Sequence, residues 1–351
     1  MKSASPRLSV GLPVYNGEKY LGQSIEALLG QNFEDFELII SDNASTDSTA
    51  DICRRYGKQD SRIRYIRQPR NIGLSLNHNA VLKESRGEYF KWAASDDLYG
   101  RDLLGSCVDA LDEYPDVVLA HSWEAVIDED GTVTQAMDYP LATDAPRAPD
   151  RFKGILFGSS GLFESTDPAV PGFVRVDNRG ILRACDIYGV ARTAVMRKVT
   201  PLGSYHHSDR IIICALALHG RFHMTPDWQY FRRDTSDRTY NKAPKLRDRC
   251  EVNDPARKNR LLHPTARLVA EYLWAFVDAI QHAPLSPADR RECYANLTQW
   301  MLDRVTSKVV HRPMVPMEAI DYRDKVSVRA VVAGQDGKLV KSAGEQGEQL
   351  S

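Results

Sequence analysis

The feature that most constrains the fold is a regular alternation of strand-like and helix-like segments over residues 8–97. Short β-rich runs predict strands at residues 8–14, 36–41 and 62–67, and a fourth that begins at residue 88. Apolar periodicity and capping residues predict helices between them, at residues 18–30, from 45–47 to about 56, and at 74–85. This β-α-β-α-β-α-β order indicates a mostly parallel sheet with helices on both faces.

The fourth strand leads into two adjacent carboxylates, Asp96 and Asp97. It is expected to bring them to the carboxyl edge of the sheet, where open α/β sheets bind their ligands. Neighbouring side chains on an extended segment point to opposite faces, so the two acids need not do the same job. One could hold a divalent cation through oxygen while the other hydrogen-bonds a polar ligand.

Four short motifs in this order resemble those of family 2 glycosyltransferases. They are PVYN at residues 13–16, ISDNASTD at 40–47, NIG at 71–73 and ASDD at 94–97. The similarity resumes at residues 202–226, where Gly203, Asp209 and Gly220 match a pattern of glycine, acidic pair and glycine. The resemblance implies inverting enzymes with the GT-A fold, a single Rossmann-like nucleotide-binding domain.

The resemblance also implies roles for individual residues. Asp97 is expected to bind the metal, Mg²⁺ or Mn²⁺, and Asp96 the ribose or an adjacent group. Asp42 would contact the base, and Asp209 would be the general base. The walls and contacts of the nucleoside pocket would come from Pro13, Tyr15, Asn16 and Asn71. Structural alternatives exist for three of these residues, namely helix capping for Asp42, a turn role for Asn71 and an N-cap role for Asp209 at the helix that follows it.

The sequence departs from the family pattern in two places. Ser208-Asp209 stands where the family often has Glu-Asp, so only one acid remains for the base. The strand before the acidic pair carries Lys91 and Trp92, which are expected to face the ligand or cap the sheet edge. The pair His206-His207 is expected in a loop near the mouth of the site, with metal binding as the less favoured alternative.

The implied reaction is metal-dependent, inverting transfer of a sugar from a nucleoside diphosphate to an acceptor hydroxyl or amine. UDP-sugars are the favoured donors, with GDP and dTDP open; the acceptor is a glycan, a lipid-linked intermediate or a natural product. Three alternatives remain. A nucleotidyltransferase would carry a glycine-rich basic loop after the first strand. A sugar-nucleotide binding module without catalytic activity would not require Asp209. A structural interaction protein would bind no nucleotide.

Composition indicates a cytoplasmic enzyme. The 46 basic and 47 acidic residues nearly cancel, so no global charge favours nucleic acid. No apolar run approaches the roughly 18–20 residues that span a bilayer, and no secretory signal is seen. The six cysteines are scattered without metal-binding spacing and are expected to be reduced.

The remaining sequence predicts three regions: a catalytic GT-A domain at residues 1–230, a mainly helical region at 231–334 and a disordered tail at 335–351. Residues 138–180 are irregular, and an acceptor surface is favoured there over a lid or disorder. The helix pair of the second region is expected to pack on the sheet domain, with a homodimer interface or an acceptor platform as the sharper alternatives. The other expected elements are helices at 102–114, 151–157, 208–218, 264–283 and 288–305, and strands at 117–127, 186–195 and 221–224.

Overall fold

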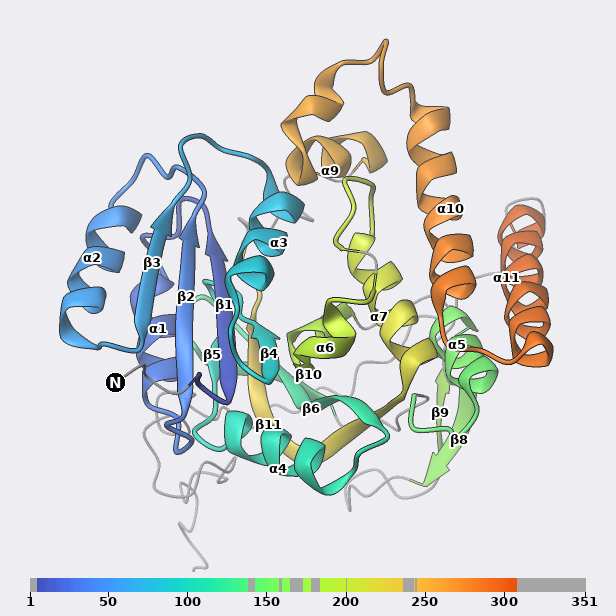
Figure 1. Ribbon diagram of the computed structural model, residues 1–351, viewed down its shortest axis with the longest axis horizontal. Coiled ribbons are helices and arrows are strands. Elements are labelled where there is room, and N and C mark those ends of the chain that lie inside the picture. The colour runs from blue at the N-terminus through green and yellow to red at the C-terminus, as the bar shows by residue number, and fades with distance from the viewer. Residues whose placement is uncertain are drawn as a thin grey trace, which may run out of the picture.

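The computed structural model describes residues 5–137, 143–157, 160–164, 173–177, 184–199, 201–235, 243 and 245–307. Its centre is a nine-stranded sheet with the order β3-β2-β1-β4-β10-β6-β11-β5, and β7 pairs with β6 (Figure 1). A separate hairpin joins β8 (Ser160–Glu164) to β9 (Phe173–Asp177). Among the described residues no helix is long and apolar enough to cross a membrane.

The first half of the chain folds as the alternation predicts. The strands are β1 (Leu8–Val14), β2 (Phe36–Asp42), β3 (Ile63–Arg67) and β4 (Tyr89–Trp92), and they pair with one another in parallel. The helices between them are α1 (Leu21–Leu29), α2 (Thr49–Gln59) and α3 (Leu74–Glu84). The expected fold class, an α/β sheet flanked by helices with a helical extension, is confirmed.

The second half of the sheet mixes orientations. β6 (Val117–Ile127) runs parallel to β11 (Arg221–Arg233), whereas β5 (Leu98–Tyr99), β7 (Val133–Met137) and β10 (Val190–Arg192) pair antiparallel with their neighbours. The helices of this half are α4 (Leu103–Glu113), α6 (Thr193–Met196) and α7 (Ser208–His219).

Two expectations for this half are wrong. The strand expected at residues 186–195 is only β10, because a 3-10 turn (Ala184–Tyr188) precedes it and α6 follows. The strand expected at 221–224 continues to Arg233, so β11 crosses the boundary that the sequence placed at residue 230. Pairing along β6 sustains this length despite register shifts between Thr225 and Tyr230.

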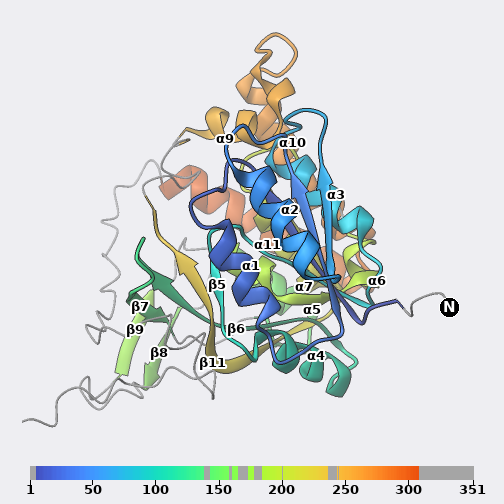
Figure 2. The ribbon, with the colours of Figure 1, turned by 90° about the vertical axis from the view of Figure 1, so that its left-hand side faces the viewer.

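The two faces of the sheet carry two apolar clusters. On one face, β1 and β2 side chains such as Leu12 and Leu38 pack with α1, α2 and α4. On the other, Phe90 and Trp92 of β4 pack with α3, α7 and the C-terminal helices. Figure 2 shows α1 and α2 together on one side of the strands and α3 on another. This two-sided cover buries both faces of the sheet, as a parallel sheet requires.

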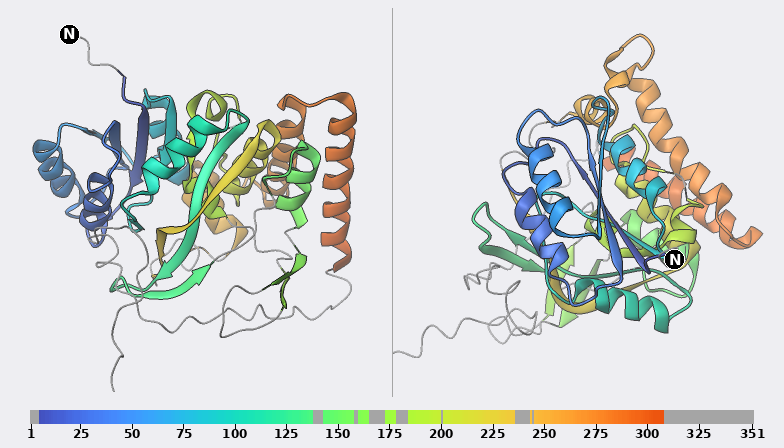
Figure 3. Two further views of the ribbon diagram at one scale, coloured as in Figure 1. Left: turned by 90° about the horizontal axis from the view of Figure 1, so that it is seen from below. Right: turned by 60° about the vertical axis from the view of Figure 1, so that its left-hand side comes forward.

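The C-terminal region adds helices beside the second face. They are α9 (Leu246–Asn253), the 3-10 turn η2 (Pro255–Lys258), α10 (Thr265–His282) and α11 (Pro287–Ser307). α10 packs on α7, and α11 packs on α5 (Ala148–Phe157). Figure 3 shows α11 at the end of the molecule opposite the first strands. Packing of the pair on the sheet domain is therefore confirmed, while dimerisation stays a prediction.

Several expectations fall on residues outside the described part of the chain. They include the tail at 335–351 and much of the segment at 138–180, of which α5, β8 and β9 are described.

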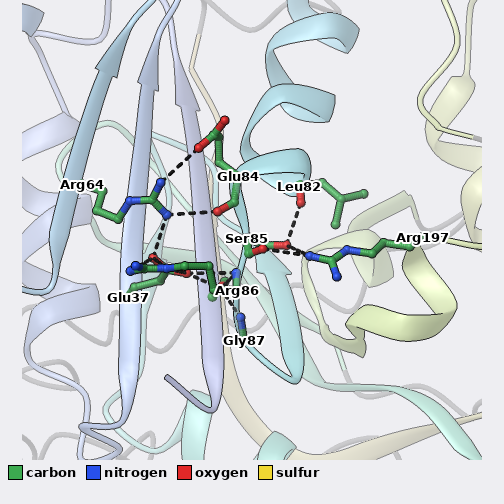
Figure 4. A network of polar contacts seen from close by, with 9 residues as sticks. Glu37, Arg64, Leu82, Glu84, Ser85, Arg86, Gly87 and Arg197 are labelled. Atoms are coloured by element: carbon green, nitrogen blue, oxygen red, sulfur yellow. Dashed lines mark hydrogen bonds and ion pairs between the residues drawn. The ribbon is translucent and has the colours of Figure 1, made fainter. Parts of the chain in front are cut away.

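A buried carboxylate joins the strands at the amino edge of the sheet. Glu37, which is 3% exposed, accepts hydrogen bonds from Ser9 Oγ at 2.7 Å, Arg64 at 2.9 Å and Arg86 at 2.7 Å (Figure 4). Burial alone would raise the pKa of Glu37, but these donors hold it below its ordinary value. The network links β1, β2, β3 and the turn before β4, so this edge is closed by paired charges.

Candidate active site at the carboxyl edge

Two loops at the carboxyl edge are tied together by hydrogen bonds. The Asn16 N–H donates to Ser45 Oγ at 2.9 Å, and Asn16 Oδ1 accepts from the Thr46 N–H at 2.9 Å. The Gly17 N–H donates to Thr49 Oγ1 at 2.8 Å. Asn16 and Ala44 both have positive φ, of 51° and 61°, so the loops after β1 and β2 are sharply bent. Such mutual bonding fixes the loops before any ligand arrives.

Asp42, the last residue of β2, holds the loop after that strand in place through its side chain. Its side chain is fully buried, with Oδ1 accepting from the Ser45 N–H at 2.7 Å and Oδ2 from Tyr65 Oη at 2.8 Å. Arg67 reaches the same Oδ2 at 3.3 Å. The helix-capping alternative for Asp42 is wrong, because α2 begins only at Thr49. Asp42 instead fixes the loop that packs against Asn16.

The turn role expected for Asn71 is observed. Its Oδ1 accepts from the Gly73 N–H at 2.9 Å and from Asn43 Nδ2 at 3.0 Å. Gly73 has a φ of 94°, and a Cβ there would lie 2.4 Å from the carbonyl oxygen of Asn253. Glycine is therefore required on both counts, and the loop after β3 is pressed against the end of α9.

The pocket residues differ in exposure. Pro13 is buried in β1, whereas Tyr15 is 48% exposed and Asn16 and Asn71 are exposed. An aromatic ring so exposed beside three bonded loops is available to stack on a planar ligand.

The two acids of the central motif have different surroundings. Asp97 is 3% exposed; its Oδ1 accepts from the Arg233 N–H at 2.9 Å and its Oδ2 from the Tyr230 hydroxyl. Burial and the neighbouring Asp96 charge raise the pKa of Asp97 to about 7. Asp96 is only partly buried. The two carboxylates therefore differ in burial, in line with the expectation that adjacent side chains on an extended segment point to opposite faces.

Arg233 anchors the acidic loop from β11. Its Nε donates to the Asp96 carbonyl oxygen at 2.8 Å, and its Nη1 donates to the carbonyl oxygens of Asp128 and Glu129 at 3.1 and 2.8 Å. The guanidinium lies 4.4 Å from the centre of the Tyr20 ring. The sequence analysis missed Arg233 and Tyr230, since both lie more than 130 positions from Asp97.

Lys91 and Trp92 do not take the expected positions. Both are 1% exposed in the core, so neither faces a ligand nor caps the edge. Lys91 Nζ donates to the Tyr188 carbonyl oxygen and lies over the Tyr99 ring, and burial lowers its pKa to about 8. Trp92 Nε1 donates to the His78 carbonyl oxygen at 2.9 Å. All four residues of β4 are buried, and the polar atoms of Lys91 and Trp92 are satisfied by backbone carbonyl oxygens inside the core.

Asp209 lies in the first turn of α7. The helix begins at Ser208 and its N-cap is His207, so the structural alternative of an N-cap role for Asp209 is wrong. Asp209 Oδ1 accepts from the Arg210 N–H at 2.8 Å. Burial raises its pKa, and its charge also acts on His78, whose carbonyl oxygen holds Trp92. A carboxylate of raised pKa is suited to accept a proton.

The histidine pair lies in the loop before α7, as expected. His206 packs against the Tyr272 ring at 4.4 Å, and His207 adopts φ 52° with its Nε2 at 3.1 Å from Arg249 Nη1. Among the described residues no group of three or more His, Cys, Asp or Glu side chains could by itself hold a metal.

Parallel strands with a bonded loop set and an acidic motif at their carboxyl edge form an α/β arrangement of the kind that binds ligands at this edge. Residues 9–166, which are less than half of the chain, match the profile of glycosyl transferase family 2. This match identifies a glycosyltransferase family 2 domain in that part of the chain, as the four motifs predicted.

Curated relatives named as glycosyltransferases are similar to about a third of the chain. Glycosyltransferase GlyG of Streptococcus pneumoniae is 31% identical over 118 residues, which are 33% of this chain and 39% of the relative. A putative teichuronic acid biosynthesis glycosyltransferase, TuaG, of Bacillus subtilis is 35% identical over 104 residues, 30% of this chain and 41% of the relative. The chain thus matches less than half the length of these two proteins.

Solved structures resemble the chain more weakly. Staphylococcus aureus TarS 1-349 in complex with UDP-GlcNAc is 17% identical with a TM-score of 0.47, over 86% of this chain and 92% of that one. The Pyrobaculum calidifontis mannosyltransferase PcManGT, in complex with GDP-Man and Mn²⁺, is 15% identical with a TM-score of 0.45, over 87% and 89%.

Proposed function

We propose that this protein transfers a sugar from a nucleoside diphosphate donor to an acceptor hydroxyl or amine, with inversion at the anomeric carbon. The observation that carries the proposal is the carboxyl edge itself, where the accessible Asp96 and the buried Asp97 follow β4 and Asp209 opens α7. Glycosyl transfer needs a cation near the departing diphosphate and a base near the acceptor.

The bonding of the acidic pair supports a division of roles opposite to the one expected from sequence. Both oxygens of Asp97 accept hydrogen bonds from β11, and the side chain is buried. Asp96 is the carboxylate nearer solvent. We therefore assign the metal to Asp96, and to Asp97 the work of fixing the loop that presents Asp96.

The residues present suit Mg²⁺ or Mn²⁺. Mg²⁺ is usually held by one or two protein carboxylates together with substrate phosphates, so a three-residue cluster is not required. When bound, the cation would neutralise charge on the leaving diphosphate. The protein's own part is to present Asp96 on a loop that Arg233 holds at its carbonyl oxygen.

Asp209 is the proposed general base. Its carboxylate is oriented by the Arg210 N–H, and burial raises its pKa. A base of raised pKa can take the proton of the acceptor as the oxygen or nitrogen attacks. Because the acceptor attacks opposite the departing diphosphate, one such step inverts the anomeric configuration.

The proposed donor pocket lies between the three bonded loops. Tyr15 offers an exposed ring to the base, and Asn16 and Asn71 border it from the loops after β1 and β3. Pro13 and Asp42 lie beneath, where Asp42 sets the position of the Ser45 N–H. Contact between Asp42 and the base would require the nucleotide to displace one of its present donors.

A thermal-shift screen tests the proposal. UDP-, GDP- and dTDP-sugars would each be added with MnCl₂, with UDP-sugars expected to stabilise the fold most, because a bound ligand shifts unfolding by mass action. A coupled assay for release of the nucleoside diphosphate, with and without candidate acceptors, then separates an enzyme from a binding module. Stabilisation without release under any condition would favour the module.

A further inference from the structure

The segment between η2 and α10 forms a tip that projects beyond the rest of the described chain (Figures 1 and 3). It carries two exposed aliphatic side chains at its end: Leu261 is 93% exposed and Leu262 is 60% exposed. Single exposed leucines are ordinary on protein surfaces, but two adjacent ones at a projecting tip indicate a surface that binds another molecule.

Positive charge surrounds these leucines. Residues 245–267 hold seven lysine or arginine residues and three acidic ones, although the whole chain has a net charge of −1. Arg257 and Arg267 both pair with Glu271, so the charge offered to a partner comes mainly from the exposed Lys258 and Arg260. The tip is therefore cationic as well as apolar.

The backbone of the tip is satisfied from within. Asn259 Oδ1 accepts from the N–H groups of Leu261 and Leu262 at 3.1 and 3.2 Å. The Leu262 carbonyl oxygen accepts from Arg267 at 2.8 Å, and that of His263 accepts from Arg247 at 2.9 Å. Paired backbone groups lower the cost of moving this turn out of water, since unpaired ones are penalised in an apolar medium.

We propose that residues 257–263 dock on an anionic lipid surface, with Leu261 and Leu262 entering the headgroup region and Lys258 and Arg260 contacting acidic headgroups. Aliphatic insertion and basic residues act together in peripheral membrane binding. A lipid surface fits better than a protein partner, because a stable protein interface buries about 800 Å² per partner, more than a two-leucine tip presents.

The helix that precedes the docking surface contacts loops of the candidate active site. The end of α9 packs on Gly73, Asn253 Nδ2 donates to the Tyr205 carbonyl oxygen at 2.8 Å, and Arg249 Nη1 lies 3.1 Å from His207 Nε2. The proposal concerns binding alone and stands without the proposed catalytic roles.

Co-sedimentation of the full chain with vesicles tests it. Binding is expected to phosphatidylcholine vesicles that contain about 30% phosphatidylglycerol, to be weak without the anionic lipid, and to fall as NaCl is raised. Leu261→Ser/Leu262→Ser and Lys258→Glu/Arg260→Glu should each lower the partition coefficient about tenfold or more. These side chains are exposed, so both variants should keep the melting temperature of the parent.

Lys58→Glu/Lys83→Glu is the matched control. It makes the same change in net charge on exposed residues near the carboxyl ends of α2 and α3, which lie toward the amino edge of the sheet. It should bind vesicles like the parent. Equal binding by parent and both tip variants, equal binding to neutral and anionic vesicles, or no binding by the parent would overturn the proposal. A change in oligomeric state of the leucine variant would assign the tip to a protein interface and also overturn it.

Discussion

Glu37 and Asp97 are each 3% exposed, yet their pKa values shift in opposite directions. At the amino edge, two arginines and a serine hold the pKa of Glu37 below its ordinary value although burial opposes them. At the carboxyl edge, burial and the adjacent Asp96 raise the pKa of Asp97 to about 7, and its donors are a phenol and a backbone amide. The carboxylate at the amino edge is thus paired with arginine side chains of the protein itself.

The contrast indicates that buried carboxylates at one edge of the sheet stabilise the fold, while those at the other edge serve the candidate site. A buried carboxylate paired with guanidinium groups is complete within the protein. Asp97 accepts its hydrogen bonds from a phenol and a backbone amide, and it lies beside a second carboxylate, so a cation that arrives at this pair can offset negative charge. Substitutions at the amino edge should therefore change the free energy of unfolding, and those at the carboxyl edge should change binding and turnover.

The largest expected effect is at the carboxyl edge. Asp209→Asn keeps the oxygen that accepts from the Arg210 N–H but removes the proton acceptor, so kcat should fall on the order of 10²–10⁴-fold. Donor affinity and melting temperature should stay close to those of the parent. Pre-steady-state assays with a working donor and acceptor would check this.

The adjacent Ser208→Ala serves as control and should retain most turnover. Near-normal rates in Asp209→Asn, with chemistry shown to limit the rate, would move the base elsewhere; His206 and His207 would be examined next.

At the amino edge the expected effect is on stability. Glu37→Gln removes the charge that Arg64 and Arg86 share, and because both arginines are partly exposed the cost should be about 2–4 kcal/mol. Urea unfolding would measure it. Turnover per folded molecule should not change. A loss of activity without a loss of stability would contradict the assignment of Glu37 to stability rather than function.

Glu84→Gln is the matched control, because Glu84 pairs with Arg64 at the surface, with 44% of its side chain exposed. That exposed pair should be worth about 0–1 kcal/mol.

Acidification should sharpen the same contrast. The folded pKa of Glu37 lies below its ordinary value of 4.5, so its stabilising effect is present above that value and is lost as pH falls through the lowered pKa. The difference in unfolding free energy between the parent and Glu37→Gln should therefore shrink between about pH 5 and about pH 3. A constant difference across this range would show that the carboxylate charge is not what stabilises the edge.

The last change, a truncation of the C-terminal residues, is expected to change neither stability nor activity. Deleting residues 335–351, whose polar, glycine-rich composition predicts disorder, should leave both edges unchanged. A lower melting temperature or lower activity in the truncated protein would show that the tail contacts the folded part.

Sequence reasoning succeeded where local pattern decides the outcome. β1 and β6 occupy the predicted residues, and α7 differs by one, because runs of apolar side chains with clear ends define them. It failed at β11, where Pro226, Asp227 and two register shifts interrupt the strand pattern. Pairing along the whole of β6 overrides the local signal there.

The site was predictable in part for the same reason. Asp96 and Asp97 follow a strand, so their edge could be read from the chain. Which of the two is buried depends on Tyr230 and Arg233, whose distance along the chain hides them from any local pattern. The strand was predicted to end at residue 224, so nothing indicated that the acidic loop would contact the last residues of β11.

The most direct test of the open carboxyl edge is calorimetry of UDP binding with Mn²⁺ in three proteins: the parent, Asp96→Asn and Asp97→Asn. Asp97→Asn keeps one oxygen to accept from Arg233, so its affinity should stay within about threefold of the parent. Asp96→Asn should weaken binding about tenfold or more, and EDTA should weaken the parent to a similar degree. If EDTA leaves the parent unchanged, or if only Asp97→Asn loses affinity, the metal does not bind at Asp96 and the account of the edge is wrong.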